Sequence, residues 1–118
     1  MIGTQGGDAQ PQILLQLLAR LLRHGESPAH AVAAPRWVLE GAGTGFDTWT
    51  SAAGPIVSVE EGAAPAWVDG LRARGHTVVE GPAFQSRYGH ANVITLGDDG
   101  MRAGVADPRA RIGSAAGR

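Results

Sequence analysis

The sequence predicts an α+β unit, and three observations carry this prediction. Leucines recur at helical spacing between Leu14 and Leu22. Residues 56–60 alternate in the manner of a half-buried strand, and residues 90–96 and 101–106 flank a Gly-Asp-Asp-Gly turn typical of a hairpin. With 118 residues the chain is one domain or part of one. We therefore predict a single unit over residues 1–118.

The first predicted helix follows a glycine-rich turn over residues 3–12, and residues 1–2 have the composition of a strand end. Pro11 suits the first turn of this helix, where its missing N–H is harmless, and Gly25 suits its end. We expect the helix to be largely buried along its apolar stripe, which consists of Leu14, Leu17, Leu18, Leu21 and Leu22.

A second, short helix of small residues is predicted over residues 29–34. Ser27 is placed to cap its N-terminus and Pro35 to end it. Residues 36–39 have strand composition, whereas residues 41–54 are rich in Gly, Thr, Ser and Ala and predict an exposed loop. Its large apolar side chains are Phe46 and Trp49, of which Trp49 could flank a ligand.

The second half of the chain alternates short strands and loops around one helix. The predicted order is a strand at 56–60, a helix at 65–74 closed by Gly75, a strand at 76–79, a loop at 81–89 and the hairpin at 90–106. Trp67, Val68 and Leu71 are expected to face inward from the helix. Residues 107–109 end the hairpin, and the tail beyond them is expected to be ordered only if something holds it.

Composition excludes several function classes. The formal net charge of −1 gives no reason to expect a nucleic-acid partner, because duplex binders present a basic face. The absence of cysteine excludes disulfides, thiol catalysis and cysteine-bound zinc. No apolar run approaches the roughly 20 residues that cross a bilayer, so no membrane span is expected. The compartment stays open between cytoplasm and periplasm or secretion.

The sequence contains no pattern typical of a metal site or of a catalytic triad. The four histidines fall in different predicted elements without the i, i+4 pair of a helical zinc site, so neither a metal nor an organic cofactor is expected. Asp98 and Asp99 lie between glycines, where a hairpin turn explains them. No serine stands in a nucleophile-elbow setting, so no triad is assigned. His24 falls in the last turn of the first helix, where the helix dipole favours a cation.

Gly6 and Gly7 are the candidate site residues. Adjacent glycines ahead of a helix let backbone N–H groups approach a ligand, and the positive end of the helix dipole favours an oxyanion there. Taken alone, such a pair is more often ordinary loop geometry than an oxyanion hole. No nucleophile with an activating base is evident elsewhere in the chain.

Four segments together resemble the gamma-glutamyltransferase (gamma-glutamyltranspeptidase) family. They are the glycine turn with its helix, Ala33-Ala34-Pro35-Arg36-Trp37, Gly89-His90-Ala91-Asn92-Val93-Ile94 and Gly104-Val105-Ala106-Asp107-Pro108-Arg109. Their order and spacing span nearly the whole chain and correspond to the C-terminal part of the family's small subunit. The resemblance implies part of the four-layer αββα sandwich of an N-terminal-nucleophile hydrolase.

The resemblance also implies a mechanism. In this family a freed N-terminal threonine attacks a gamma-glutamyl amide and passes the acyl group to water or an amine, and its own amino group can be the base. That threonine would lie outside this chain, whereas Gly6 and Gly7 match the oxyanion-hole glycines. Gln5 stands where many members have proline, and we expect Asp8 to cap the helix.

The implied partners are the large subunit and the remaining small-subunit sequence of the same precursor, and a gamma-glutamyl small molecule as substrate. The isolated chain would then be inactive and could self-associate through uncovered sheet edges and leucines. Two alternatives stay open. One is a non-catalytic domain that keeps the scaffold and binds an anion or a partner, and the other is a glutaryl-type acylase of the same family.

Overall fold

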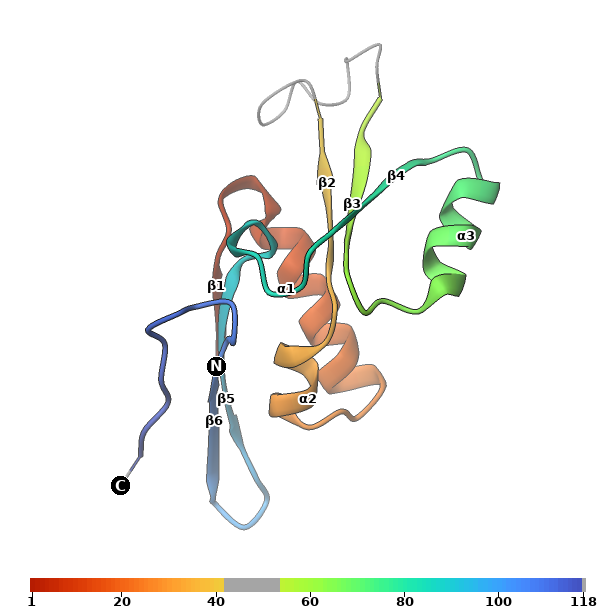
Figure 1. The fold of residues 1–118 in the computed structure, drawn as a ribbon. Coiled ribbons are helices and arrows are strands. Elements are labelled where there is room, and N and C mark those ends of the chain that lie inside the picture. Colours follow the sequence, from red (N-terminus) through yellow and green to blue (C-terminus); the bar gives the residue numbers. More distant parts are fainter. Residues whose placement is uncertain (42–53, 118) are drawn as a thin grey trace.

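The computed structural model describes residues 1–41 and 54–117, which form two three-stranded sheets (Figure 1). The first sheet contains β1 (Ile2–Gln5), β5 (His90–Leu96) and β6 (Arg102–Ala106) in the antiparallel order β1-β5-β6. The second contains β2 (Trp37–Glu40), β3 (Ile56–Glu60) and β4 (Thr77–Gly81), with β2 antiparallel and β4 parallel to β3. The predicted α+β class is therefore confirmed.

The helices occupy the predicted positions with small shifts. They are η1 (Gly7–Ala9), α1 (Gln10–Leu18), the π-helical turn η2 (Ala19–Arg23), α2 (Pro28–Ala33), α3 (Pro65–Ala73) and η4 (Ser86–Tyr88). The Ser27 hydroxyl accepts a hydrogen bond from His30 N at 3.3 Å, as expected of an N-cap. Gly25 follows η2 with a φ of +65°, which a glycine adopts without steric cost.

α1 and α2 pack on the β1-β5-β6 sheet, and α3 packs against β4 (Figure 1). The main core consists of Ile13, Leu17, Ala31, Val32, Val38, Tyr88, Ala91 and Val93, and a smaller core of Val57, Val59 and Val68. Both cores are formed by side chains that strand alternation and helix periodicity bring to one face.

The expected burial of the first helix is wrong in part. Leu17 of the predicted stripe is buried, together with Ile13, which was not part of the stripe, whereas Leu18 is 37% exposed and Leu22 is 80% exposed. The i, i+4 pair lies against the sheet, whereas the flanking leucines extend beyond what the described part of the chain covers. Trp67 was also expected to face inward but is 37% exposed. Of the α3 side chains, Val68 is the buried member of the second core.

The free edge of β2 is covered by two glutamines of α1. The Gln16 side chain donates to Trp37 O at 2.8 Å and accepts from Trp37 N at 3.0 Å. Gln12 Oε1 accepts from Leu39 N at 2.7 Å. The two amides thereby satisfy backbone groups that a neighbouring strand would otherwise pair.

The second half follows the predicted order closely. Residues 97–100 form the hairpin turn that joins β5 to β6, and Gly97 N donates to Met101 O at 2.8 Å. β3, α3 and β4 form a parallel crossover unit. The predicted loop at 81–89 contains η4, and residues 111–117 form an exposed tail without regular structure. Most of the predicted loop at 41–54, with Phe46 and Trp49, lies outside the described residues.

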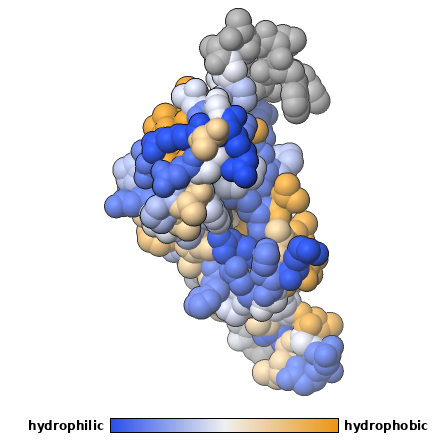
Figure 2. Space-filling view, turned by 90° about the vertical axis from the view of Figure 1, so that its right-hand side faces the viewer, coloured by the Kyte–Doolittle hydropathy of each residue, from blue (hydrophilic) through white to orange (hydrophobic). Residues whose placement is uncertain are grey.

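The surface leaves several large apolar side chains exposed. Figure 2 shows apolar patches, in orange, interrupted by polar surface. Leu22, Leu96, Met101 and Ile112 are each more than two-thirds exposed. No helix in the described residues is long and apolar enough to cross a membrane.

We predict that the 118 residues expressed alone form oligomers or aggregates. The exposed apolar side chains and the open edges of β4 and β6 favour contacts between copies. Size-exclusion chromatography with light scattering measures the mass in solution. A stable monomer at micromolar concentration would contradict the prediction.

Candidate functional site

The glycine pair lies where β1 ends and the helical segment begins (Figure 1). Gly6 is extended, with a φ of −177°, and Gly7 has a φ of +52° in the left-handed region, which other residues rarely occupy. The Gly6 carbonyl accepts from Ala9 N at 3.0 Å, and the Gly7 carbonyl accepts from Gln10 N. The turn therefore uses its carbonyl groups internally.

The N–H groups of the pair have a different environment. Among the described turn, loop and cap hydrogen bonds, none has Gly6 N or Gly7 N as donor. Gly7 is exposed, and a Cβ built on it would meet open space. At Gly6 a Cβ would lie 2.9 Å from Ile13 Cδ1 in the core. Two backbone donors thus stand at the entrance to α1 with open space beside Gly7.

The expected capping role of Asp8 is wrong. Neither η1 nor α1 has a side-chain cap hydrogen bond, and the N-cap residue of α1 is Ala9. Asp8 lies inside η1, which runs directly into α1, so its position is within the helical turn and not ahead of it. Its exposed carboxylate lies in the first turn, where the helix dipole favours negative charge.

Gly89 lets the start of β5 pack closely beneath the turn. It is buried with a φ of +80°, and a Cβ there would lie 2.9 Å from Thr4 Oγ1 and 3.0 Å from Gln5 O. A Cβ on Gly6 would in turn lie 3.7 Å from Gly89 Cα. Two glycines far apart in sequence therefore face each other, which fixes the turn against β5.

A buried ionic cluster of Arg36, Glu60, Asp107 and Arg109 supports this region. Arg109 Nε donates to Glu60 Oε1 at 2.9 Å, and its Nη2 contacts Glu60 Oε2. Arg109 Nη1 lies 3.0 Å from Asp107 Oδ1, and Arg36 Nη2 lies 2.7 Å from Asp107 Oδ2. All four residues are at most 3% exposed. Two cations and two carboxylates balance each other where isolated charges would be very costly.

The cluster also holds the backbone at the start of β5, which packs against the glycine turn. Arg36 Nη1 donates to Tyr88 O at 2.9 Å and to Gly89 O at 3.3 Å, and Asp107 Oδ2 accepts from Ala91 N at 2.8 Å. Burial lowers the pKa of the Arg36 guanidinium, and the Arg109 charge lowers it further, while Asp107 raises it. The start of β5 is thus fixed by charge-assisted hydrogen bonds.

Sequence reasoning noted Arg36, Asp107 and Arg109 as parts of motifs but assigned them no role, and it treated Glu60 as the end of a strand. The sequence offered one weak signal, because Glu60 directly follows the apolar Val59 within the predicted strand. Sequence reasoning also left the serines unpaired, whereas Ser86 Oγ lies 2.9 Å from His90 Nε2.

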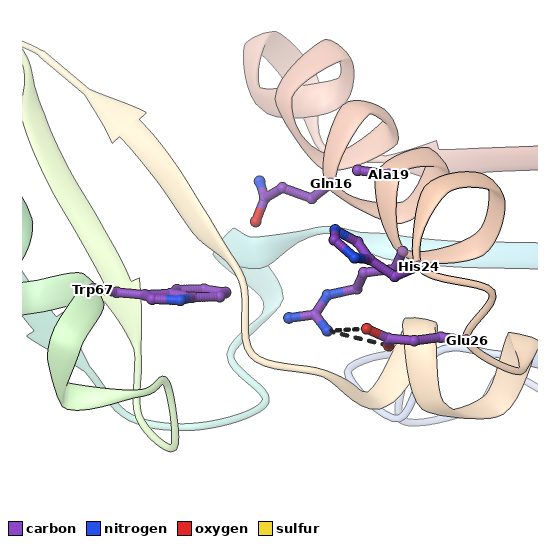
Figure 3. A pocket seen from close by; sticks show the side chains of 6 residues that line it. Gln16, Ala19, His24, Glu26 and Trp67 are labelled. Carbon is purple, nitrogen blue, oxygen red and sulfur yellow. Dashed lines mark hydrogen bonds and ion pairs between the residues drawn. The ribbon is translucent and has the colours of Figure 1, made fainter.

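A separate cleft lies near the other end of the first helix, between η2 and α3. Figure 3 shows Trp67 on one side and Gln16 and His24 on the other. Arg20 is paired with Glu26 at 2.9 and 3.1 Å, and its guanidinium lies 5.8 Å from the Trp67 ring centroid. Because the cation is already paired, this cleft is a weaker candidate site than the glycine turn. Among the described residues no cluster of His, Asp and Glu could hold a metal ion.

Comparison with known proteins decides the family. The sequence profile described as gamma-glutamyltranspeptidase matches residues 1–117. The chain belongs to the gamma-glutamyltranspeptidase family. The resemblance inferred from the four segments is thereby confirmed. The family is one of hydrolases and transferases, and solved gamma-glutamyltranspeptidases share its N-terminal-nucleophile hydrolase fold with this chain.

The individual relatives are named for different activities. The chain is 34% identical to an oxamate amidohydrolase proenzyme of Klebsiella pneumoniae, over 98% of this chain and 20% of that protein. It is 32% identical to the glutathione hydrolase-like YwrD proenzyme of Bacillus subtilis, over 92% and 19%. The crystal structure of a cephalosporin acylase from Bacillus halodurans superposes with a TM-score of 0.72 at 25% identity, over 92% and 18%. The chain thus spans about a fifth of the length of these relatives.

Proposed function

We propose that these residues are the C-terminal part of the small subunit of a gamma-glutamyltransferase or hydrolase, and that Gly6 and Gly7 form its oxyanion hole. The supporting observation is the glycine turn at the start of the helical segment, whose two N–H groups donate to no carbonyl in the described turn. We further propose that the two sheets belong to a four-layer αββα sandwich completed by other residues of the precursor.

In this proposal the nucleophile is a threonine freed by self-cleavage of the precursor, outside residues 1–118. Its hydroxyl loses a proton to its own α-amino group and attacks the carbonyl carbon of a gamma-glutamyl amide. The carbonyl π electrons move to oxygen, and the Gly6 and Gly7 N–H groups donate to that oxyanion. Collapse of the intermediate expels the amine, which takes a proton, and leaves an acyl-enzyme ester. Water or an acceptor amine then attacks the ester and releases the threonine.

The electrostatics of the turn favour this role. Positive partial charge at the N-terminus of a helix stabilises a nearby anion. The left-handed conformation of Gly7 lets successive N–H groups face one concavity, a geometry used by other backbone anion sites. Gln5 stands before the pair instead of proline, and it is held in β1 by pairing with His90.

Which amide the enzyme cleaves is a separate question, because the relatives are named for different amides. The similarity to a glutathione hydrolase-like protein supports a gamma-glutamyl amide as the substrate. The similarities to an oxamate amidohydrolase and a cephalosporin acylase support other acyl groups. The glycine turn stabilises the oxyanion of any of them, since it contacts only the carbonyl oxygen. A glutaryl-type acylase is therefore our second candidate function.

The test is to express the full-length precursor and to assay gamma-glutamyl p-nitroanilide, glutaryl p-nitroanilide and oxamate side by side. We expect cleavage into two subunits, a new N-terminal threonine by mass spectrometry, and highest kcat/KM on the gamma-glutamyl amide. The control replaces that threonine by alanine, which abolishes both cleavage and turnover. A precursor that is never cleaved and hydrolyses none of the amides would instead support a non-catalytic scaffold.

A further inference from the structure

A hollow of about 830 Å³ opens beside the loop that leads into β5. Its walls come from residues 82–87, His90, Arg109, Arg111 and Ile112. Among the described residues that line it, none is Asp or Glu, whereas three are arginine. The charged side chains that line the hollow are therefore all cationic.

Two of these arginines have charge to offer a ligand. Arg111 has no ion-pair partner within the part of the chain that the structure describes, and Arg87 approaches Glu40 only at 3.7 Å, with both side chains half-exposed. The third, Arg109, is already neutralised by Glu60 and Asp107. A surface pair as long as that of Arg87 contributes little, so its guanidinium can turn to a ligand at small cost.

Ser86 and His90 add polar recognition at the same wall. Ser86 Oγ lies 2.9 Å from His90 Nε2. If the hydroxyl donates to Nε2, the neutral ring carries its proton on Nδ1 and can donate it. The wall thus carries a hydroxyl and an imidazole, held 2.9 Å apart, in addition to the two guanidinium groups.

The hollow also has apolar walls. Phe84 is 51% exposed and Ile112 is 98% exposed, and both line it. Exposed apolar side chains beside unneutralised cations match a ligand with an anionic end and an apolar body.

We propose that this hollow binds a small organic carboxylate, with its charge at Arg111 and Arg87 and its apolar body against Phe84 and Ile112. Guanidinium groups match the planar, two-oxygen geometry of a carboxylate. The site is distinct from the glycine turn, and the proposal does not depend on the chemistry assigned to Gly6 and Gly7.

The test uses the full-length protein and fluorine NMR of para-fluorobenzoate, with neutral para-fluorobenzamide as the matched ligand. We expect the carboxylate to bind at millimolar concentration and the amide to bind at least about tenfold more weakly. R111Q is expected to weaken carboxylate binding by about tenfold, and S86A by a smaller factor. The control is R102Q, which removes an arginine from β6 that does not line the hollow.

Three outcomes would overturn the proposal: no carboxylate binding, equal binding of the amide, or R111Q and S86A both binding as the parent does. Arg111 and Ser86 are exposed in the described part of the chain, so neither substitution removes core packing among these residues. Because binding is read without turnover, a protein that lacks amidase activity can still support this site, and an active enzyme can still refute it.

Discussion

Replacing Arg109 by methionine is expected to destabilise the protein by about 3–5 kcal/mol, the largest stability effect that the described contacts predict. Methionine keeps an unbranched apolar side chain but leaves the Glu60 and Asp107 carboxylates buried beside a single cation, Arg36. It also removes donors from Val32 O and Ala34 O, each bonded at 2.9 Å. Thermal and denaturant unfolding of the full-length protein measure the loss.

The matched control is R102M, which makes the same change on an exposed residue of β6 and should stay within about 0.5 kcal/mol of the parent. A second variant that combines Arg109→Met with Glu60→Gln should recover part of the stability, because it removes the unpaired carboxylate together with its partner. If R109M has the same unfolding midpoint as R102M and the parent, the ionic cluster does not stabilise the protein as assigned here.

The elements of the fold were predictable because their signals are local. The hairpin at 90–106 carries its own turn residues, and the second helix carries both its cap, Ser27, and its stop, Pro35. Periodicity also located the first helix, but it does not reveal what covers each face. Leu22 matched the stripe as well as Leu17, yet only Leu17 has the sheet beneath it.

The ionic cluster was not predictable because its pairs are distant in sequence. Glu60 and Arg109 are 49 residues apart, with Glu60 at the end of β3 and Arg109 beyond the end of β6. A charge in a strand or after a hairpin is normally solvated, so only the fold shows that these four charges meet. The same limit applies to Gly89. A side chain at this position would collide with Thr4 and Gln5, which come from the other end of the chain.

The candidate site was predictable in its residues but not in its conformation. Gly6 and Gly7 stood out as a pair ahead of a helix, and the simplest substitution that would delete an N–H there is Gly7→Pro. The φ of +52° makes that variant unsuitable, because proline requires a φ near −65° and would rebuild the turn. The conformation of the turn leads to a better experiment.

Gly7→Val in the full-length protein is expected to lower kcat by about 100-fold or more, with a smaller effect on KM, because in the proposed mechanism it disturbs donors that act on the transition state. A β-branched residue is strongly disfavoured at a φ of +52°, so the N–H groups of the turn change direction. Asparagine tolerates this region and keeps the N–H, and a side chain at this position meets open space. Gly7→Asn should therefore retain kcat within about tenfold of the parent.

The kcat value must be calculated per mole of cleaved enzyme, because a substitution in this turn can also affect processing of the precursor. A semisynthetic enzyme with an ester in place of the Gly7 amide isolates the donor, because it deletes the N–H while leaving the chain free to keep its φ. We expect it to lose about 2.7–4 kcal/mol of transition-state stabilisation. A processed ester enzyme with parental kcat, or equal losses in Gly7→Val and Gly7→Asn, would remove Gly7 from the oxyanion hole and leave the turn a structural feature of the fold.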